Sequence, residues 1–212
     1  MAKQMKKYLV ELIGTFLFVL VVGMTVISPG AGNLAPLAIG CILMIMVYAG
    51  GHVSGGHYNP AVTLSVWMRG RCAGSDVLPY WGSQILGALA ASQVVCFLKG
   101  NPTVTPQIIS VGPSLVAEFI GTFTLCYVVL NVATAKATAG NSYFGLAIGF
   151  AVVVMAYALG GVSGGAFNPA IATGITAMHL EKASNLWVYL VGDLAAGAVA
   201  AGVFKFVHPE DP

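Results

Sequence analysis

The chain has very little charge. Only 8% of its 212 residues are Asp, Glu, Lys or Arg, against about 25% in soluble domains, and 58% are hydrophobic. We therefore expect an integral membrane protein whose surroundings are the lipid bilayer. The formal net charge of +2 and the lack of a run of basic residues argue against a nucleic-acid partner.

Cysteine is also scarce, and its spacing fits neither a metal centre nor a redox pair. The interpretation is small apolar packing residues, with no metal site and no cofactor. An intramembrane enzyme would need a nucleophile beside a base, or paired aspartates at one depth, and the sequence shows neither. We predict that the protein is not an enzyme. The four cysteines are Cys41, Cys72, Cys96 and Cys126.

Long apolar runs fill most of the chain. Each is long enough, or nearly so, to cross ~30 Å of hydrocarbon, and none alternates as a barrel strand does. The first run holds Glu11 and is too long for the core of a signal peptide, so we read it as a retained membrane helix. The fold class is therefore all-α integral membrane. The six predicted spans are residues 8–27, 34–49, 78–98, 113–133, 142–159 and 186–207.

One short motif occurs twice, as GGHVSGGHYNPA at 50–61 and LGGVSGGAFNPA at 159–170. Asn59 and Asn168 are good helix N-caps, and Pro60 and Pro169 suit the first helical position. The glycine run before each Asn predicts an irregular, strand-like segment. The apolar residues after each box predict a helix of about ten residues, whereas a span needs ~20. We therefore predict two half-helices.

The duplication covers most of the chain. ELIGTFLFVLVV from Glu11 returns as EFIGTFTLCYVV from Glu118, and the 25 residues from Leu37 match those from Leu146 at 15 positions. We predict one channel domain, 1–212, made of a first repeat, 1–106, and a second, 107–212. Three spans per half invert the second half relative to the first, about an axis in the membrane plane.

The distribution of basic residues indicates the orientation. With the N-terminus inside, only Lys99 and Lys182 fall outside the cell, which is the bias that the positive-inside rule describes. Both termini are then cytoplasmic, in the cell (inner) membrane. The basic residues on the cytoplasmic side are Lys3, Lys6, Lys7, Arg69, Arg71, Lys136 and Lys205.

Inversion brings the positive N-terminal ends of the two half-helices together near the midplane. Asn59 and Asn168 are expected there, each capping its own helix with its oxygen and turning its NH₂ into the cavity as a donor. Backbone carbonyls of the glycine runs are expected to line the approaches. Such a path would pass small neutral molecules and oppose cations. The carbonyl-lined path comprises Gly55, Gly56, His57, Tyr58, Gly164, Gly165, Ala166 and Phe167, and the two boxes are Asn59-Pro60-Ala61 and Asn168-Pro169-Ala170.

The paired Asn-Pro-Ala boxes, ELIGTF/EFIGTF and the Tyr80–Gln84–Gly87 span resemble the aquaporin (major intrinsic protein) family over essentially the whole chain. The resemblance implies six helices with two re-entrant half-helices and a homotetramer with one pore in each subunit. It also implies that Glu11 and Glu118 anchor the re-entrant loops, which agrees with the cost of a membrane carboxylate that accepts no hydrogen bonds.

The resemblance also assigns a selectivity filter to Ile39, Ala156, Gly165 and Ile171. Water-selective members have Arg at the position of Ile171, and often an aromatic residue and a His among the others. Small and aliphatic residues at all four positions predict a wide gate that passes water and a small uncharged solute such as ammonia, urea, glycerol or hydrogen peroxide. Alternatively, a neighbouring side chain narrows the gate and water dominates.

A secondary transporter is the rival interpretation, because carriers also use inverted repeats and broken helices. A carrier needs buried acids near the break, and none of Glu11, Glu118 and Asp193 is expected beside the asparagine pair. Asp193 is expected to bond the backbone or a polar neighbour such as Asn185 or Tyr189, with a transport role as the alternative. His52 and His57 are read as loop hydrogen-bonding residues, with a pH gate as the alternative.

Overall fold

The structure is a computed structural model that describes residues 2–211, with side chains from Gln4 to Asp211. Its described residues form helices and no strands, and six helical segments are long and apolar enough to span a membrane. Lys3 lies outside the described side chains. The helices are α1 (Ala2–Val26), α2 (Ala35–Ser54), α3 (Pro60–Met68), α4 (Gly74–Leu98), α5 (Val111–Val129), α6 (Phe144–Ser163), α7 (Pro169–Ala177) and α8 (Leu186–Val207).

The predicted fold class is confirmed, but α2 and α6 are longer than predicted. Both continue through the first glycines of their motifs and end at Ser54 and Ser163, not near residues 49 and 159. Glycine lowers helix propensity in water, yet in a bundle it allows close approach of another backbone. At Gly40, for example, an added Cβ would lie 2.5 Å from the Gly149 oxygen of α6. At Gly50 an added Cβ would lie 2.6 Å from Val10 of α1, whereas at Gly160 nothing lies within 4 Å, and the helix continues through both glycines.

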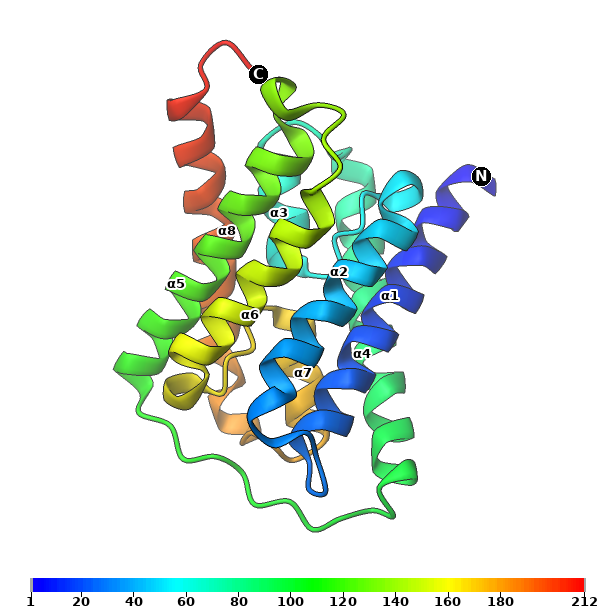
Figure 1. Cartoon of the computed structure of the whole chain (residues 1–212), viewed down its shortest axis with the longest axis vertical. Coiled ribbons are helices and arrows are strands. Elements are labelled where there is room, and N and C mark those ends of the chain that lie inside the picture. The colour runs from blue at the N-terminus through cyan, green and yellow to red at the C-terminus, as the bar shows by residue number, and fades with distance from the viewer. Residues whose placement is uncertain (1, 212) are drawn as a thin grey trace.

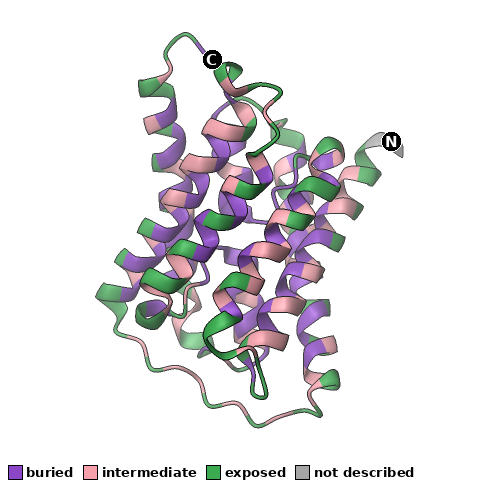
Figure 2. Ribbon diagram, viewed as in Figure 1, coloured by how far each residue is buried: buried purple, intermediate pink, exposed green. Residues whose placement is uncertain are grey.

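The other span boundaries differ by a few residues. Helix α1 starts at Ala2 and α4 starts at Gly74, with Pro79 inside its first two turns. Helix α5 ends in a π-helical turn, Leu130–Thr134. The bundle has both chain ends at the same end, as an even number of crossings requires, and its outward faces are the exposed ones (Figures 1 and 2).

The two halves pack in the same pattern. Helix α1 packs on α2 and α4, and correspondingly α5 packs on α6 and α8, while α2 packs against α6 between the halves. Each half-helix packs on the last helix of the other half: α3 on α8, and α7 on α4. Figure 1 shows α3 in the part of the bundle nearer the termini and α7 in the opposite part. The two repeats therefore share one core.

The C-terminal segment folds over the end of the bundle that carries the termini. The Asp211 carboxylate accepts from the Lys136 backbone N–H at 2.7 Å and from the buried Arg69 guanidinium at 2.8 Å. These two contacts hold the pKa of Asp211 below its usual value. Nearby, burial and the neighbouring Asp76 raise the pKa of the Cys72 thiol to about 11, so this thiol stays protonated at neutral pH.

Candidate pore

The re-entrant loops are shorter and less extended than predicted. Only four residues separate Ser54 from Asn59, and only four separate Ser163 from Asn168. Positive φ values occur at Gly55 (94°), Gly56 (65°) and Tyr58 (49°), so the prediction of a strand-like run is wrong. A loop bent in this way can turn successive N–H groups toward one point, where an anion can bind. The matching positive-φ residues in the second loop are Gly164, Gly165 and Phe167.

Glu11 of α1 is the anion for the first loop. It is fully buried, and its Oε1 accepts from Ser54 Oγ at 2.6 Å and from the His57 N–H at 2.9 Å. Its Oε2 accepts from the Tyr58 N–H at 2.7 Å and from Gln84 Nε2 at 2.8 Å. Four donors therefore surround one carboxylate, which satisfies backbone N–H groups that the loop leaves without helical partners.

Glu118 of α5 holds the second loop in the same way. It accepts from Ser163 Oγ at 2.5 Å and from the N–H groups of Ala166 at 3.1 Å and Phe167 at 2.6 Å. Glu118 is also fully buried. The two loops thus have equivalent supports from α1 and α5, as the repeat predicts.

The asparagines join the tips of the two half-helices. Each caps its own helix: Asn59 Oδ1 accepts from the Ala61 N–H at 2.8 Å, and Asn168 Oδ1 accepts from the Ala170 N–H at 2.8 Å. Each also reaches across. Asn59 Nδ2 donates to the Phe167 carbonyl at 2.9 Å, and Asn168 Nδ2 donates to the Tyr58 carbonyl at 2.9 Å. Two reciprocal hydrogen bonds therefore link the two re-entrant loops to each other.

This junction changes two details of the predicted path. One hydrogen of each asparagine NH₂ binds a carbonyl of the other loop, so the NH₂ group is not wholly free to face a cavity. The carbonyls of Tyr58 and Phe167, predicted as free acceptors, are the ones used. The sequence did not indicate this because each donor and its acceptor are more than 100 residues apart.

The rings of Tyr58 and Phe167, at the junction, pack directly against glycines of α1 and α5. A Cβ built on Gly14 would lie 2.0 Å from the Tyr58 ring, and one on Gly121 would lie 2.2 Å from the Phe167 ring. Tyr58 is further fixed by its hydroxyl, which donates to the Met46 carbonyl at 2.9 Å. Rings that cannot shift keep their backbone carbonyls in place for the asparagines. Both repeats contain the sequence GTF, at 14–16 and 121–123, and its glycine is the residue on which the ring packs.

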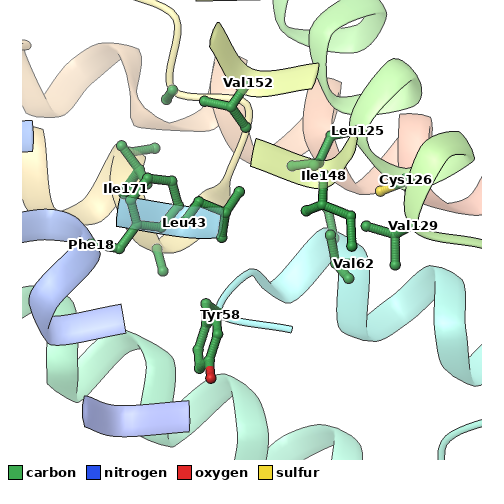
Figure 3. Packing of buried hydrophobic residues seen from close by; sticks show 14 of the residues in the cluster. Phe18, Leu43, Tyr58, Val62, Leu125, Cys126, Val129, Ile148, Val152 and Ile171 are labelled. Atoms are coloured by element: carbon green, nitrogen blue, oxygen red, sulfur yellow. The ribbon is translucent and has the colours of Figure 1, made fainter. Parts of the chain in front are cut away.

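The four predicted filter residues differ in exposure. Ile39, Ala156 and Gly165 are partly exposed, whereas Ile171 in α7 is 3% exposed. Figure 3 shows Ile171 beside Phe18 and Leu43, with which it shares one buried apolar cluster. Ile171, which the family resemblance assigns to the filter, is thus a packed aliphatic side chain.

A cavity of about 770 Å³ opens at the end of the bundle that carries the termini. Its lining reaches from Arg71 and Lys136 at the mouth to Gly55 and His57, two residues before Asn59. His57 Nδ1 is 3.1 Å from Thr63 Oγ1, which fits the loop hydrogen bonding expected of this residue. The cavity thus extends from the surface to the first re-entrant loop.

The buried acids are arranged differently from the predictions. Glu11 and Glu118 bind the N–H groups of Tyr58 and Phe167, each directly before an asparagine, so the expectation that no acid lies beside the pair is wrong. Asp193 bonds neither Asn185 nor Tyr189, which both donate to Glu181. Asp193 does bond a polar neighbour, as predicted, but this neighbour is Thr122, whose Oγ1 donates to Asp193 Oδ1 at 2.7 Å.

Sequence reasoning missed the hydroxyl residues around the loops. Ser54 and Ser163 donate to the two glutamates and accept from the N–H groups of Gly56 and Gly165. Thr63 contacts both His57 and Gln84. The serines recur at equivalent places in both motifs, so the repeat itself could have identified them. Among the residues with described side chains, no group of three His, Cys, Asp or Glu residues is placed to hold a metal ion.

Comparison with known proteins agrees with this geometry. The family model described as "Major intrinsic protein" matches residues 1–204. The chain belongs to the major intrinsic protein family. It is 36% identical to aquaporin NIP2-1 of rice over 98% of the chain and 72% of that protein. It is 34% identical to the probable aquaporin TIP2-2 of rice, over 98% of the chain and 89% of that protein.

A solved structure shares the fold. The aquaglyceroporin of Plasmodium falciparum superimposes with a TM-score of 0.81 at 21% identity, over 97% of this chain and 98% of that one. Family membership and the six apolar helices make this a multi-pass membrane protein of a family of passive channels, not enzymes.

Proposed function

We propose that the protein is a passive channel for water and small uncharged solutes, with the pathway centred on Asn59 and Asn168. The observation that carries this proposal is the reciprocal pair of hydrogen bonds between the two re-entrant loops, with a cavity that reaches the first of these loops from one end. Helix N-termini that meet there create a positive field, which opposes cations and admits neutral hydrogen-bonding molecules.

A carrier is less consistent with the same contacts. The oxygens of Glu11 already accept from four neutral donors, so this acid offers no free oxygen to a coupling ion. We therefore retain the secondary transporter only as an outcome to be tested. A carrier flux saturates with the gradient, whereas a channel flux does not saturate early.

The proposed filter consists of Ile39, Ala156, Gly165 and Ile171, and the proposed permeants besides water are ammonia, urea, glycerol or hydrogen peroxide. The support is the lack of a charged or strongly polar side chain at these positions. The carbonyls of Gly55, Gly56, His57, Gly164 and Ala166 remain as proposed acceptors along the approaches.

The proposal includes a homotetramer with one pore in each subunit, as the family resemblance implies. It places the protein in the cell (inner) membrane with both termini in the cytoplasm. Arg69, Arg71 and Lys136 lie around Asp211 at the end of the bundle that carries the termini, and Lys99 lies at the other, bonded to the Ile27 carbonyl. This distribution supports the cytoplasmic assignment.

The test is stopped-flow light scattering of vesicles containing purified protein, with water, glycerol, urea and ammonia compared in parallel. Protein-free vesicles are the control. We expect faster water flux and faster flux of at least one solute, without early saturation. Vesicles no leakier than the control would overturn the channel, and passage of water alone would overturn the wide filter.

Replacing Ile171 with arginine should narrow the filter. We expect solute flux to fall about tenfold relative to water flux, which corresponds to ~1.4 kcal/mol of added barrier. Since Ile171 is packed among apolar residues, Ile171→Leu serves as the matched control, and both variants are first checked for a monodisperse elution profile. A correctly folded Ile171→Arg protein with unchanged solute flux would show that Ile171 is not at the constriction.

A further inference from the structure

The two loop-anchoring glutamates have different fourth neighbours. Around Glu11 the fourth donor is the Gln84 amide of α4, at 2.8 Å. The repeat puts Asp193 of α8 at the place of Gln84. The register is the same in both halves, because Tyr80 donates to the Ser54 carbonyl at 2.7 Å and Tyr189 donates to the Ser163 carbonyl at 2.5 Å. A carboxyl group therefore stands where the first repeat uses an amide donor.

Asp193 lies directly against Glu118. Its side chain is fully buried, and its Oδ1 accepts from Thr122, one turn after Glu118 on α5. A Cβ on the preceding Gly192 would lie 3.2 Å from the Glu118 Cβ, so the two helices are in close contact here. The carboxyl groups of Asp193 and Glu118 are therefore neighbours across the contact between α5 and α8. The other oxygen, Asp193 Oδ2, has no N–H or O–H donor among the described residues.

Two adjacent carboxylates cannot both be ionised in an apolar interior, because each is costly to bury and they repel each other. Among the described side chains, no Lys, Arg or His forms an ion pair with either acid. The titratable groups that face the pair are Tyr189 on α8, Cys126 on α5 and, through Tyr189, Glu181 of the adjoining loop. All of these are neutral or anionic, so the pair needs a proton.

We propose that Asp193 is protonated and donates a hydrogen bond to Glu118, as a positioning residue for the second re-entrant loop. The proton supplies what the Gln84 amide supplies in the first half. Glu118 in turn holds the Phe167 N–H, and the Phe167 carbonyl receives the Asn59 amide. One buried proton thus helps to fix the asparagine junction. This inference rests on the proposed channel function only in the last of the three measurements below, the water permeability.

The first measurement is infrared spectroscopy of the purified protein across a pH titration. We expect the C=O stretching band of a protonated, buried carboxyl in the wild type, which persists at neutral pH and is lost in Asp193→Asn. The mirror variant Gln84→Glu places a second acid beside Glu11 and should add a second such band. A wild-type spectrum without this band, or one that Asp193→Asn leaves unchanged, would overturn the proposal.

The second measurement is thermal unfolding in detergent as a function of pH. Asp193→Asn retains a donor for Glu118 and should keep its melting temperature when the pH is raised, whereas the wild type loses its bridging proton and melts earlier. Asp193→Leu leaves Glu118 without this donor, and we expect about a tenfold larger unfolded fraction at neutral pH. Equal losses in the Asn and Leu variants would show that Asp193 acts by shape alone.

The last readout is the pH profile of water permeability, with each protein normalised to its own value at neutral pH. We expect the wild-type rate to fall at high pH and the Asp193→Asn rate to stay level. If neither protein conducts water, the channel proposal fails while the infrared band and the unfolding data still decide the protonation of Asp193.

Discussion

Glu11→Leu should leave no folded channel. Leucine fills a similar space but accepts no hydrogen bond, so four donors of Ser54, His57, Tyr58 and Gln84 lose their acceptor inside the bundle. A buried donor without a partner costs about 1–3 kcal/mol. Four of them approach the ~5–15 kcal/mol that typically separates native from unfolded protein.

The measurement is the elution profile and melting temperature of the detergent-solubilised protein. Glu11→Gln is the matched control, since it keeps one acceptor oxygen and the side-chain length but loses the charge. We expect its stability to lie between those of the wild type and the leucine variant. A leucine variant that elutes and melts like the wild type would mean that the loop is held by other contacts.

Gly14→Ala should displace Tyr58 and disrupt the junction of the two half-helices. The added methyl would lie 2.0 Å from a ring that is fixed at its hydroxyl by Met46 and at its backbone by Glu11. Overpacking of this kind costs about 1–3 kcal/mol or more. Because the Tyr58 carbonyl accepts from Asn168, we also expect a loss of water permeability among the molecules that remain folded.

Gly82→Ala provides the control for this second experiment. Gly82 lies within α4, where nothing stands within 4 Å of an added Cβ. Alanine there should be neutral or stabilise the protein by about 0.4–1 kcal/mol. Melting temperature and stopped-flow water flux are measured on both variants. Equal behaviour of Gly14→Ala and Gly82→Ala would show that Tyr58 can move without consequence.

The sequence predicts the architecture well because the repeat constrains it. The paired Asn-Pro-Ala boxes indicate the half-helices, and the shared Glu, Gly and Asn positions predict which residues occupy equivalent places. The ends of α2 and α6 were predicted too early, because Gly50 and Gly160 were read as loop residues although they are helical. Propensity alone does not show that Val10 of α1 and the Tyr58 hydroxyl leave no room for a Cβ at Gly50.

Contacts between distant segments were beyond reach of the sequence. The acceptors of the asparagine amides belong to the opposite loop, and the partner of Asp193 is a threonine on α5. Residues near in the chain, such as Asn185 and Tyr189, were the natural candidates for Asp193, but they face Glu181. Only the fold decides among several polar groups at one depth.

The exchange of half-helices between the repeats has a consequence for biogenesis. Helix α3 packs on α8, which is synthesised after the whole first repeat, while α7 packs on α4. Before α8 is made, the first re-entrant segment has only the partners of its own repeat, which are α4 and the Glu11 carboxylate of α1. The hydrogen bonds between Asn59 and the Phe167 carbonyl and between Asn168 and the Tyr58 carbonyl need both loops. The junction therefore cannot form until the second re-entrant segment has been synthesised.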